Sequence, residues 1–229
     1  MTYDGQPVWE NQAALDNICF SRELQPTLFS GQNNLKIRHY LRSAAIYYPG
    51  WDREYAQRLL EEFKLDEKKK ICQLSKGQMS MVTILIALAS RSPITILDEP
   101  AAGLDVVMRE RFYQLLLDDF AQTGRTFLVS THIIEDVQSV CDQIVVIDHG
   151  KILFTGTPAQ LIQAAAGHVG VFWAQDAPQD QGLHITARVN TSQGIRCRAV
   201  ADVLPPYASL EEPSLEDAYL YLISKEAAQ

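Results

Sequence analysis

Apolar residues in the first third of the chain recur mainly with helical spacing. Between residues 33 and 90 the pattern is that of helices with one buried face. In one of them Leu59 and Phe63 follow Tyr55 on the same face, and Asp52 stands where an N-cap is preferred. This segment is therefore predicted to be mostly helical.

Shorter apolar runs elsewhere in the first 165 residues predict strands. The runs 94–97 and 126–130 are rich in β-branched residues and have the pattern of parallel strands buried on both faces. A helix is expected between them, over about residues 106–122. Residues 17–21 predict one more strand, and 144–154 a pair of strands. This alternation of strand and helix predicts an α/β core with a parallel sheet.

The composition changes near the alanine run at 164–166. Three alternating apolar segments follow it, and an amphipathic helix is expected from about Ser214. We therefore expect residues 1–165 to form the main domain, with a helical subdomain at about 33–90. Residues 166–229 are expected to form a small α+β accessory region.

Composition and charge narrow the classes of function. The 229 residues carry a net charge of −8, with a pI of about 5.1, which argues against nucleic acid as a partner. The four cysteines are far apart and fit neither a metal site nor a disulfide framework. The longest apolar stretch, 79–89, is too short to span a bilayer, and the N-terminus does not have the pattern of a signal peptide. We therefore expect a soluble intracellular chain; if it works at a membrane, another protein must hold it there.

Two acids follow the expected strand at 94–97. The carboxyl ends of strands in open α/β sheets are where ligands bind, so Asp98 and Glu99 are candidates for Mg²⁺ binding and for activation of water. Two solvated acids without a function are the alternative. His132 follows the strand at 126–130 and is a candidate of the same kind, although a lone histidine is more often structural.

The sequence LSKGQ at 74–78 precedes a helical pattern. Ser75 and Gly77 would lie at the helix N-terminus, where free backbone N–H groups favour an anion and glycine lets a phosphate approach closely. An ordinary serine N-cap would explain the same residues.

The order LSKGQ, ILDEP, AAGLD and STH between Leu74 and His132 resembles the signature, Walker B, D-loop and switch-histidine motifs of ABC-type ATP-binding subunits. The resemblance extends from about Val8 to Ile162 and implies a partial P-loop NTPase core. It implies ATP and Mg²⁺ as cofactors. The roles that it implies are catalysis for Glu99 and His132, Mg²⁺ binding for Asp98 and Glu23, and nucleotide binding for Ser75, Lys76, Gly77, Gln78, Asp98, Asp105 and Glu23.

Two of these positions depart from the family pattern. Lys76 stands where many members have glycine. Glu23, in a segment that resembles the Q-loop, stands where most have glutamine; an acid can bind water or metal but cannot donate as an amide does. The aromatic segment 47–52 either packs under its own helices or belongs to the surface that receives a membrane partner. With the residues up to 65 it resembles a bacterial subgroup that serves exporter-type (ABC-2-like) permeases.

One family motif is missing, because no stretch fits G-x-x-x-x-G-K-[ST], the phosphate-binding Walker A loop. We expect an ABC subunit shortened at its N-terminus, with poor affinity for ATP when alone. A central strand missing from a sheet would also leave exposed edges that promote aggregation.

The leading hypothesis is an ATP-hydrolysing subunit of an ABC transporter. It would pair with a second such subunit, identical or different, and couple ATP hydrolysis to transport through an integral-membrane permease at the inner face of the cell membrane. The alternative is a non-catalytic partner that supplies LSKGQ in trans to an intact subunit. An ABC protein outside transport, such as a translation or repair factor, is a third possibility.

Overall fold

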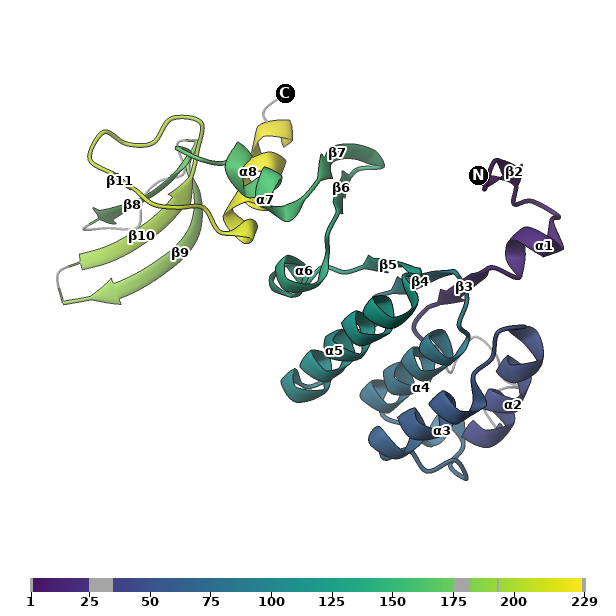
Figure 1. Ribbon diagram of the computed structural model, residues 1–229. Coiled ribbons are helices and arrows are strands. Elements are labelled where there is room, and N and C mark those ends of the chain that lie inside the picture. The colour runs from purple at the N-terminus through teal and green to yellow at the C-terminus, as the bar shows by residue number, and fades with distance from the viewer. Residues whose placement is uncertain (1, 25–34, 175–181, 193, 228–229) are drawn as a thin grey trace. The chain divides into compact units, whose positions relative to one another are not determined.

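The chain forms two compact units, Met1–His132 and Ile133–Gln229, in a computed structural model (Figure 1). The structure describes residues 2–24, 35–174, 182–192 and 194–227. The elements of the first unit are β1 (Thr2–Tyr3), β2 (Gln6–Pro7), α1 (Gln12–Leu15), β3 (Ile18–Ser21), α2 (Ile37–Tyr47), α3 (Arg53–Glu62), the short 3₁₀ turn η2 (Ile71–Gln73), α4 (Lys76–Ala89), β4 (Ile94–Asp98), α5 (Val106–Thr123) and β5 (Thr126–Ser130). Those of the second are α6 (Ile134–Val140), β6 (Ile144–Asp148), β7 (Lys151–Gly156), α7 (Pro158–Ala164), β8 (Val169–Ala174), β9 (His184–Thr191), β10 (Gly194–Val200), β11 (Ser209–Leu210) and α8 (Leu215–Ala227).

The first unit is built on a parallel sheet in the order β3-β4-β5. Ile18 pairs with Ile94, and Ile94 with Thr126, so the three strands begin in register and end at one edge. Asp98, the last residue of β4, lies opposite Ser130, the last residue of β5. The predicted parallel α/β core is confirmed, and its carboxyl edge carries the candidate acids.

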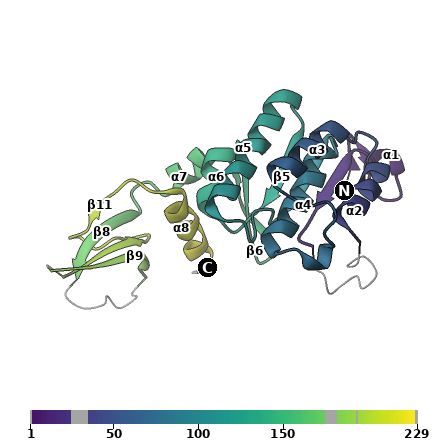
Figure 2. The same cartoon turned by 90° about the horizontal axis from the view of Figure 1, so that it is seen from below.

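The helices α4 and α5 lie side by side on one face of this sheet (Figures 1 and 2). On β4, Thr95 and Leu97 are buried, whereas Ile96 is only half-buried. On the neighbouring strands Phe20 and Leu128 are 55% and 52% exposed. The prediction that these strands are buried on both faces is therefore wrong for the structure as described, because α4 and α5 cover only the face that carries Thr95 and Leu97.

Residues 37–89 are mostly helical, as predicted for 33–90, of which 33 and 34 lie outside the described residues. The side chain of Asp52 caps α3 by accepting a hydrogen bond from the Tyr55 N–H at 2.9 Å. Leu59 and Phe63 are buried, and α3 packs against α4. This small helical subdomain is thus held by the same helix that begins with LSKGQ.

The second unit contains an antiparallel pair, β6-β7, and an antiparallel sheet in the order β11-β8-β10-β9. Its core joins Leu161 of α7 with Val169 of β8 and Tyr221 of α8. Apolar side chains on both sides of residue 165 therefore share one core, and the structure divides the chain earlier, after His132. Every helix that the structure describes is too short or too polar to cross a lipid bilayer.

Candidate functional site

The carboxyl ends of β4 and β5 are joined by a hydrogen bond between side chains. The Ser130 hydroxyl donates to Oδ1 of Asp98 at 2.5 Å. The Glu99 N–H donates to the carbonyl oxygen of Ser130 at 3.1 Å, so the chain beyond β4 is also tied to β5. These contacts fix the Asp98 carboxylate at the edge of the sheet where α/β proteins place their ligands. The sequence pattern indicates a role for Asp98 but not for Ser130, the first residue of STH.

Glu99 and His132 come together just beyond the two strand ends. Nδ1 of His132 lies 2.8 Å from Oε2 of Glu99, and the two side chains are 76% and 35% exposed. Glu99 has a φ of +48°, in the left-handed region that is uncommon for residues other than glycine. An outlier of this kind is held by surrounding structure, and such outliers cluster at functional sites. The two predicted catalytic residues are thus in direct contact.

The LSKGQ segment forms the N-terminus of α4. Ser75 is the N-cap: its hydroxyl accepts from the Gln78 N–H, and the Gln78 side chain accepts in turn from the Ser75 N–H, both at 3.2 Å. This capping box uses the polar groups of both side chains within the helix end. Ser75 and Lys76 are nevertheless exposed, so the helix N-terminus is accessible from solvent.

The first turns of α4 pack tightly on the AAGLD loop. A Cβ at Gly77 would lie only 2.6 Å from the carbonyl oxygen of Gly103, and Gly103 has a φ of +79°. The Ser80 hydroxyl donates to the Ala102 carbonyl oxygen at 2.6 Å. The two motifs thus form one local structure, in which glycine is required at both points of closest approach. In the sequence, only Gly77 and Gly103 hint at this contact, because glycine permits close approach. Nothing in the sequence indicates that Ser80 takes part in it.

The remaining predicted ligands lie beside these two motifs. Nζ of Lys76 forms an ion pair with Oε1 of Glu23 at 3.1 Å. Asp105 is the N-cap of α5, and its carboxylate accepts from the Met108 N–H at 2.8 Å. The structure therefore gathers the predicted residues in two groups, one at the strand ends and one around the N-terminus of α4. Their roles toward a nucleotide stay predictions.

A family model described as "AAA domain, putative AbiEii toxin, Type IV TA system" matches residues 10–135, more than half of the chain. That range includes every candidate site residue. The chain belongs to this AAA-domain family.

Its curated homologues are ATP-binding subunits of ABC transporters. "ABC transporter ATP-binding protein YtrB" of Bacillus subtilis (strain 168) is 33% identical over 97 residues, which are 42% of this chain and 33% of that protein. "Nod factor export ATP-binding protein I" of Rhizobium johnstonii is 30% identical over 183 residues, which are 73% of this chain and 58% of that protein. The chain thus spans between a third and somewhat more than half of the length of these relatives.

Solved structures support the same relationship. The chain titled "Structure of ATP binding subunit of ABC transporter" superposes with a TM-score of 0.61 at 25% identity, covering 71% of this chain and 68% of that one. The fold is therefore the α/β fold of ABC ATPases. The resemblance inferred from LSKGQ, DEP, AAGLD and STH is confirmed at the level of the family, while the exporter subgroup stays a prediction.

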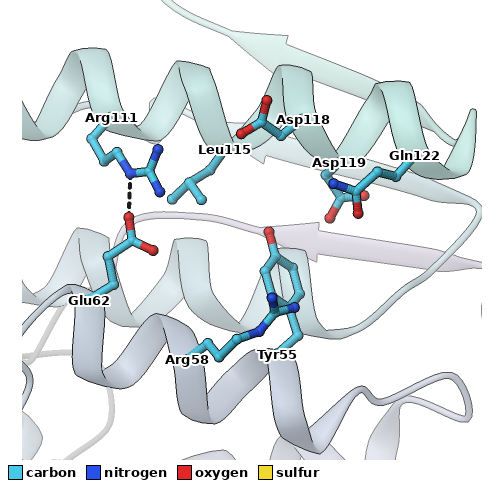
Figure 3. Close-up of a pocket in the computed structure, with 8 residues that line it drawn as sticks. All are labelled: Tyr55, Arg58, Glu62, Arg111, Leu115, Asp118, Asp119 and Gln122. Atoms are coloured by element: carbon cyan, nitrogen blue, oxygen red, sulfur yellow. Dashed lines mark hydrogen bonds and ion pairs between the residues drawn. The ribbon is translucent and has the colours of Figure 1, made fainter.

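A surface pocket of about 180 Å³ lies between α3 and α5, away from the strand ends. Figure 3 shows Glu62 of α3 joined to Arg111 of α5 at one end and Tyr55 beneath Asp119 at the other. The Arg58 guanidinium lies 5.1 Å from the centre of the Tyr55 ring. None of the candidate site residues is among the described residues that line this pocket, so it is separate from the candidate site.

Proposed function

We propose that this chain is an ATP-binding subunit of an ABC transporter and contributes to ATP hydrolysis in a complex with a second subunit. One observation carries the proposal: Glu99 and His132 are 2.8 Å apart, directly beyond the Asp98–Ser130 pair at the carboxyl edge of a parallel sheet. This is an arrangement of an acid and an imidazole that can orient and deprotonate water next to a site for phosphate.

In this proposal the residues at the strand ends act on the nucleotide of the same subunit. The Glu99 carboxylate would accept the proton of the attacking water, and His132 would hold that carboxylate through Nδ1. Asp98, with Glu23 as a second candidate, fits a magnesium site, because Mg²⁺ is commonly held by one or two carboxylates together with phosphate and water oxygens. The metal ion, when bound, neutralises charge on the β- and γ-phosphates.

The residues around the N-terminus of α4 would act on the nucleotide of the second subunit. Ser75 and Lys76 are exposed at the positive end of the dipole of the 14-residue helix α4. Gly77 lets the AAGLD loop pack against the first turn of α4, and Gln78 orders this turn by capping it. Asp105 would lie at the interface between the two subunits.

The sequence has no Walker A loop, so we infer that this chain binds ATP weakly by itself and works only in a complex. An integral-membrane permease is the expected second partner and would hold the chain at the cytoplasmic face of the membrane. The names of two relatives, which refer to ABC transport and to Nod factor export, support this role and favour an exporter.

A mixing experiment tests the proposal. The purified chain is combined with an intact ABC subunit, and ATP hydrolysis is measured for the mixture and for each protein alone. If the chain takes part in a shared site, the rate of the mixture exceeds the sum of the separate rates, and Ser75→Arg removes the excess. A mixture that hydrolyses no faster than its components would overturn the proposal.

The same assay separates the catalytic role from the non-catalytic alternative, which the absent Walker A loop favours. A catalytic subunit loses a large part of the excess rate when Glu99 is changed to glutamine. A subunit that only supplies LSKGQ is sensitive to Ser75→Arg and insensitive to Glu99→Gln. Glu110→Gln, on an exposed position of α5, is the control for a change of charge alone.

A further inference from the structure

The two positions that depart from the ABC pattern contact each other. Glu23 stands where most members have glutamine and Lys76 where many have glycine, and Nζ of the lysine lies 3.1 Å from Oε1 of the acid. One residue follows β3 and the other is in the first turn of α4, 53 positions later in the chain. The charges are opposite, so each compensates the other. A glutamine and a glycine at these positions could not form this pair.

The stem of Lys76 is also held in place. A Cβ at Gly103 would lie 2.7 Å from Cγ of Lys76 and 3.1 Å from its Cδ, so the lysine runs directly across the backbone of the AAGLD loop. Glycine at 103 thus leaves the space that the lysine stem occupies. The stem of Lys76 contacts the AAGLD loop, and its ammonium group pairs with Glu23. These two contacts fix the direction of a side chain that is 56% exposed.

We propose that Glu23 and Lys76 form an ion-pair latch that positions the LSKGQ turn and that opens when the turn engages a phosphate. This inference rests on the proposed function for the identity of the phosphate, a triphosphate held by the second subunit. While the pair is closed, the Lys76 ammonium group is held by the Glu23 carboxylate. Lys76 is therefore a positioning residue in the closed state and a phosphate ligand only after release.

The strength of such a pair suits a latch that opens readily. Ion pairs between exposed side chains stabilise a protein only slightly, so breaking this one should change the local opening equilibrium by about two- to fivefold. A phosphate carries more charge than one carboxylate and can displace it from the lysine. Opening would also free the Glu23 carboxylate, which is a candidate ligand of Mg²⁺ in the chain's own site. Occupation of one site would thereby affect the other.

Hydrogen exchange tests the closed state without any nucleotide. The amide groups of Gln78 and Met79 report on the turn, because both donate hydrogen bonds to Ser75. Glu23→Gln and Lys76→Met, which keeps the lysine stem, should each speed their exchange by about two- to fivefold. The exchanged pair Glu23→Lys with Lys76→Glu should restore most of the protection, and high salt should remove the differences. Lys68→Met, at an exposed lysine of the preceding turn, is the control. Unchanged exchange in the single variants, or no recovery in the exchanged pair, overturns the latch.

Association with an ATP-loaded intact subunit tests the opening. Glu23→Gln releases the lysine and should tighten association by about two- to fivefold, whereas Lys76→Met removes the phosphate ligand and should weaken it. Weaker or equal association of Glu23→Gln overturns release onto phosphate. If no variant and no wild-type chain associates in ATP, the proposed function fails, while the exchange result still decides whether the ion pair holds the turn.

Discussion

Arg125 donates two hydrogen bonds to the carboxylate of Asp119, from Nε to Oδ1 and from Nη2 to Oδ2, both of 2.8 Å. The Asp119 side chain is fully buried, and it also accepts from Nη1 of Arg91 at 2.9 Å. Arg91 in turn reaches Asp52, the N-cap of α3, at 3.0 Å. Two arginines and two aspartates thus join the start of β5, the end of α5, the turn after α4 and the helical subdomain. This network fixes the subdomain relative to the sheet.

Removing the central acid should destabilise the first unit strongly. Asp119→Leu leaves Arg125 buried without a counter-ion, and breaking a buried pair in this way costs about 3–5 kcal/mol. Urea unfolding followed by circular dichroism measures the loss. Asp118→Asn is the matched control, because this neighbouring acid is exposed and its neutralisation should change stability by less than about 0.5 kcal/mol. Equal effects of the two changes would show that the network contributes little.

The close contact of Gly77 with Gly103 gives a prediction in which two effects have opposite signs. Alanine forms helices better than glycine by about 1 kcal/mol, so Gly77→Ala on α4 should stabilise if helix propensity decides. The new Cβ would lie 2.6 Å from a backbone carbonyl oxygen that a side chain cannot move away from. Forced shifts of this kind cost about 1–3 kcal/mol, so we expect net destabilisation in urea unfolding. A more stable variant would contradict the tight packing.

Structural features that depend on residues close together in the chain could be predicted from the sequence. The strand ending at Asp98, the helix that begins after Ser75 and the cap at Asp52 each follow from local spacing and from the type of residue. Glu99 and His132 were each predicted to follow a buried strand, and the structure brings them together because β4 and β5 are neighbours. Parallel strands end at one edge, so this proximity follows from the topology.

Features that depend on contacts between distant residues could not be predicted. Nothing local indicates that Arg91 and Arg125 share Asp119, or that Lys76 reaches Glu23, since charged residues that are far apart in the sequence have many possible partners. The exposure of Leu128 was missed for a related reason: an apolar strand pattern does not tell which face of the sheet has a helix on it. The left-handed conformation of Glu99 likewise depends on its surroundings.

The second unit should lose stability in acid through Asp217. Burial alone would raise the pKa of this carboxyl group, but hydrogen bonds from Arg198 and from Ser214 outweigh burial and hold the pKa below its ordinary value. The unfolded chain then binds a proton at a higher pH than the native chain does. The stabilisation is therefore complete above the unfolded pKa of about 3.9 and is lost as the pH falls through the lower native pKa.

Asp217→Asn tests this contribution. The variant should be less stable than the wild type at about pH 6, and the difference should shrink as the pH falls below about 4. Urea unfolding at a series of pH values measures both. Glu216→Gln changes the adjacent exposed acid and should leave the pH dependence as it is in the wild type. A difference that is constant with pH would show that Asp217 acts by packing and not by its charge.

Ser130 should matter for catalysis more than for folding. Its hydroxyl donates to Asp98, and a hydrogen bond to a charged group is worth about 1.5–3 kcal/mol, so Ser130→Ala should slow hydrolysis at this chain's site by about 10- to 100-fold. Both side chains are exposed, which lets water replace the lost partner, and stability should fall by less than about 1 kcal/mol. Ser130→Thr keeps the hydroxyl on a residue that suits a strand and should retain most of the rate. The ATP hydrolysis of the mixed complex measures the rates of both variants, and urea unfolding measures the stability of Ser130→Ala. If Ser130→Ala and Ser130→Thr are equally slow, the space around the side chain decides the rate and the hydroxyl does not position Asp98.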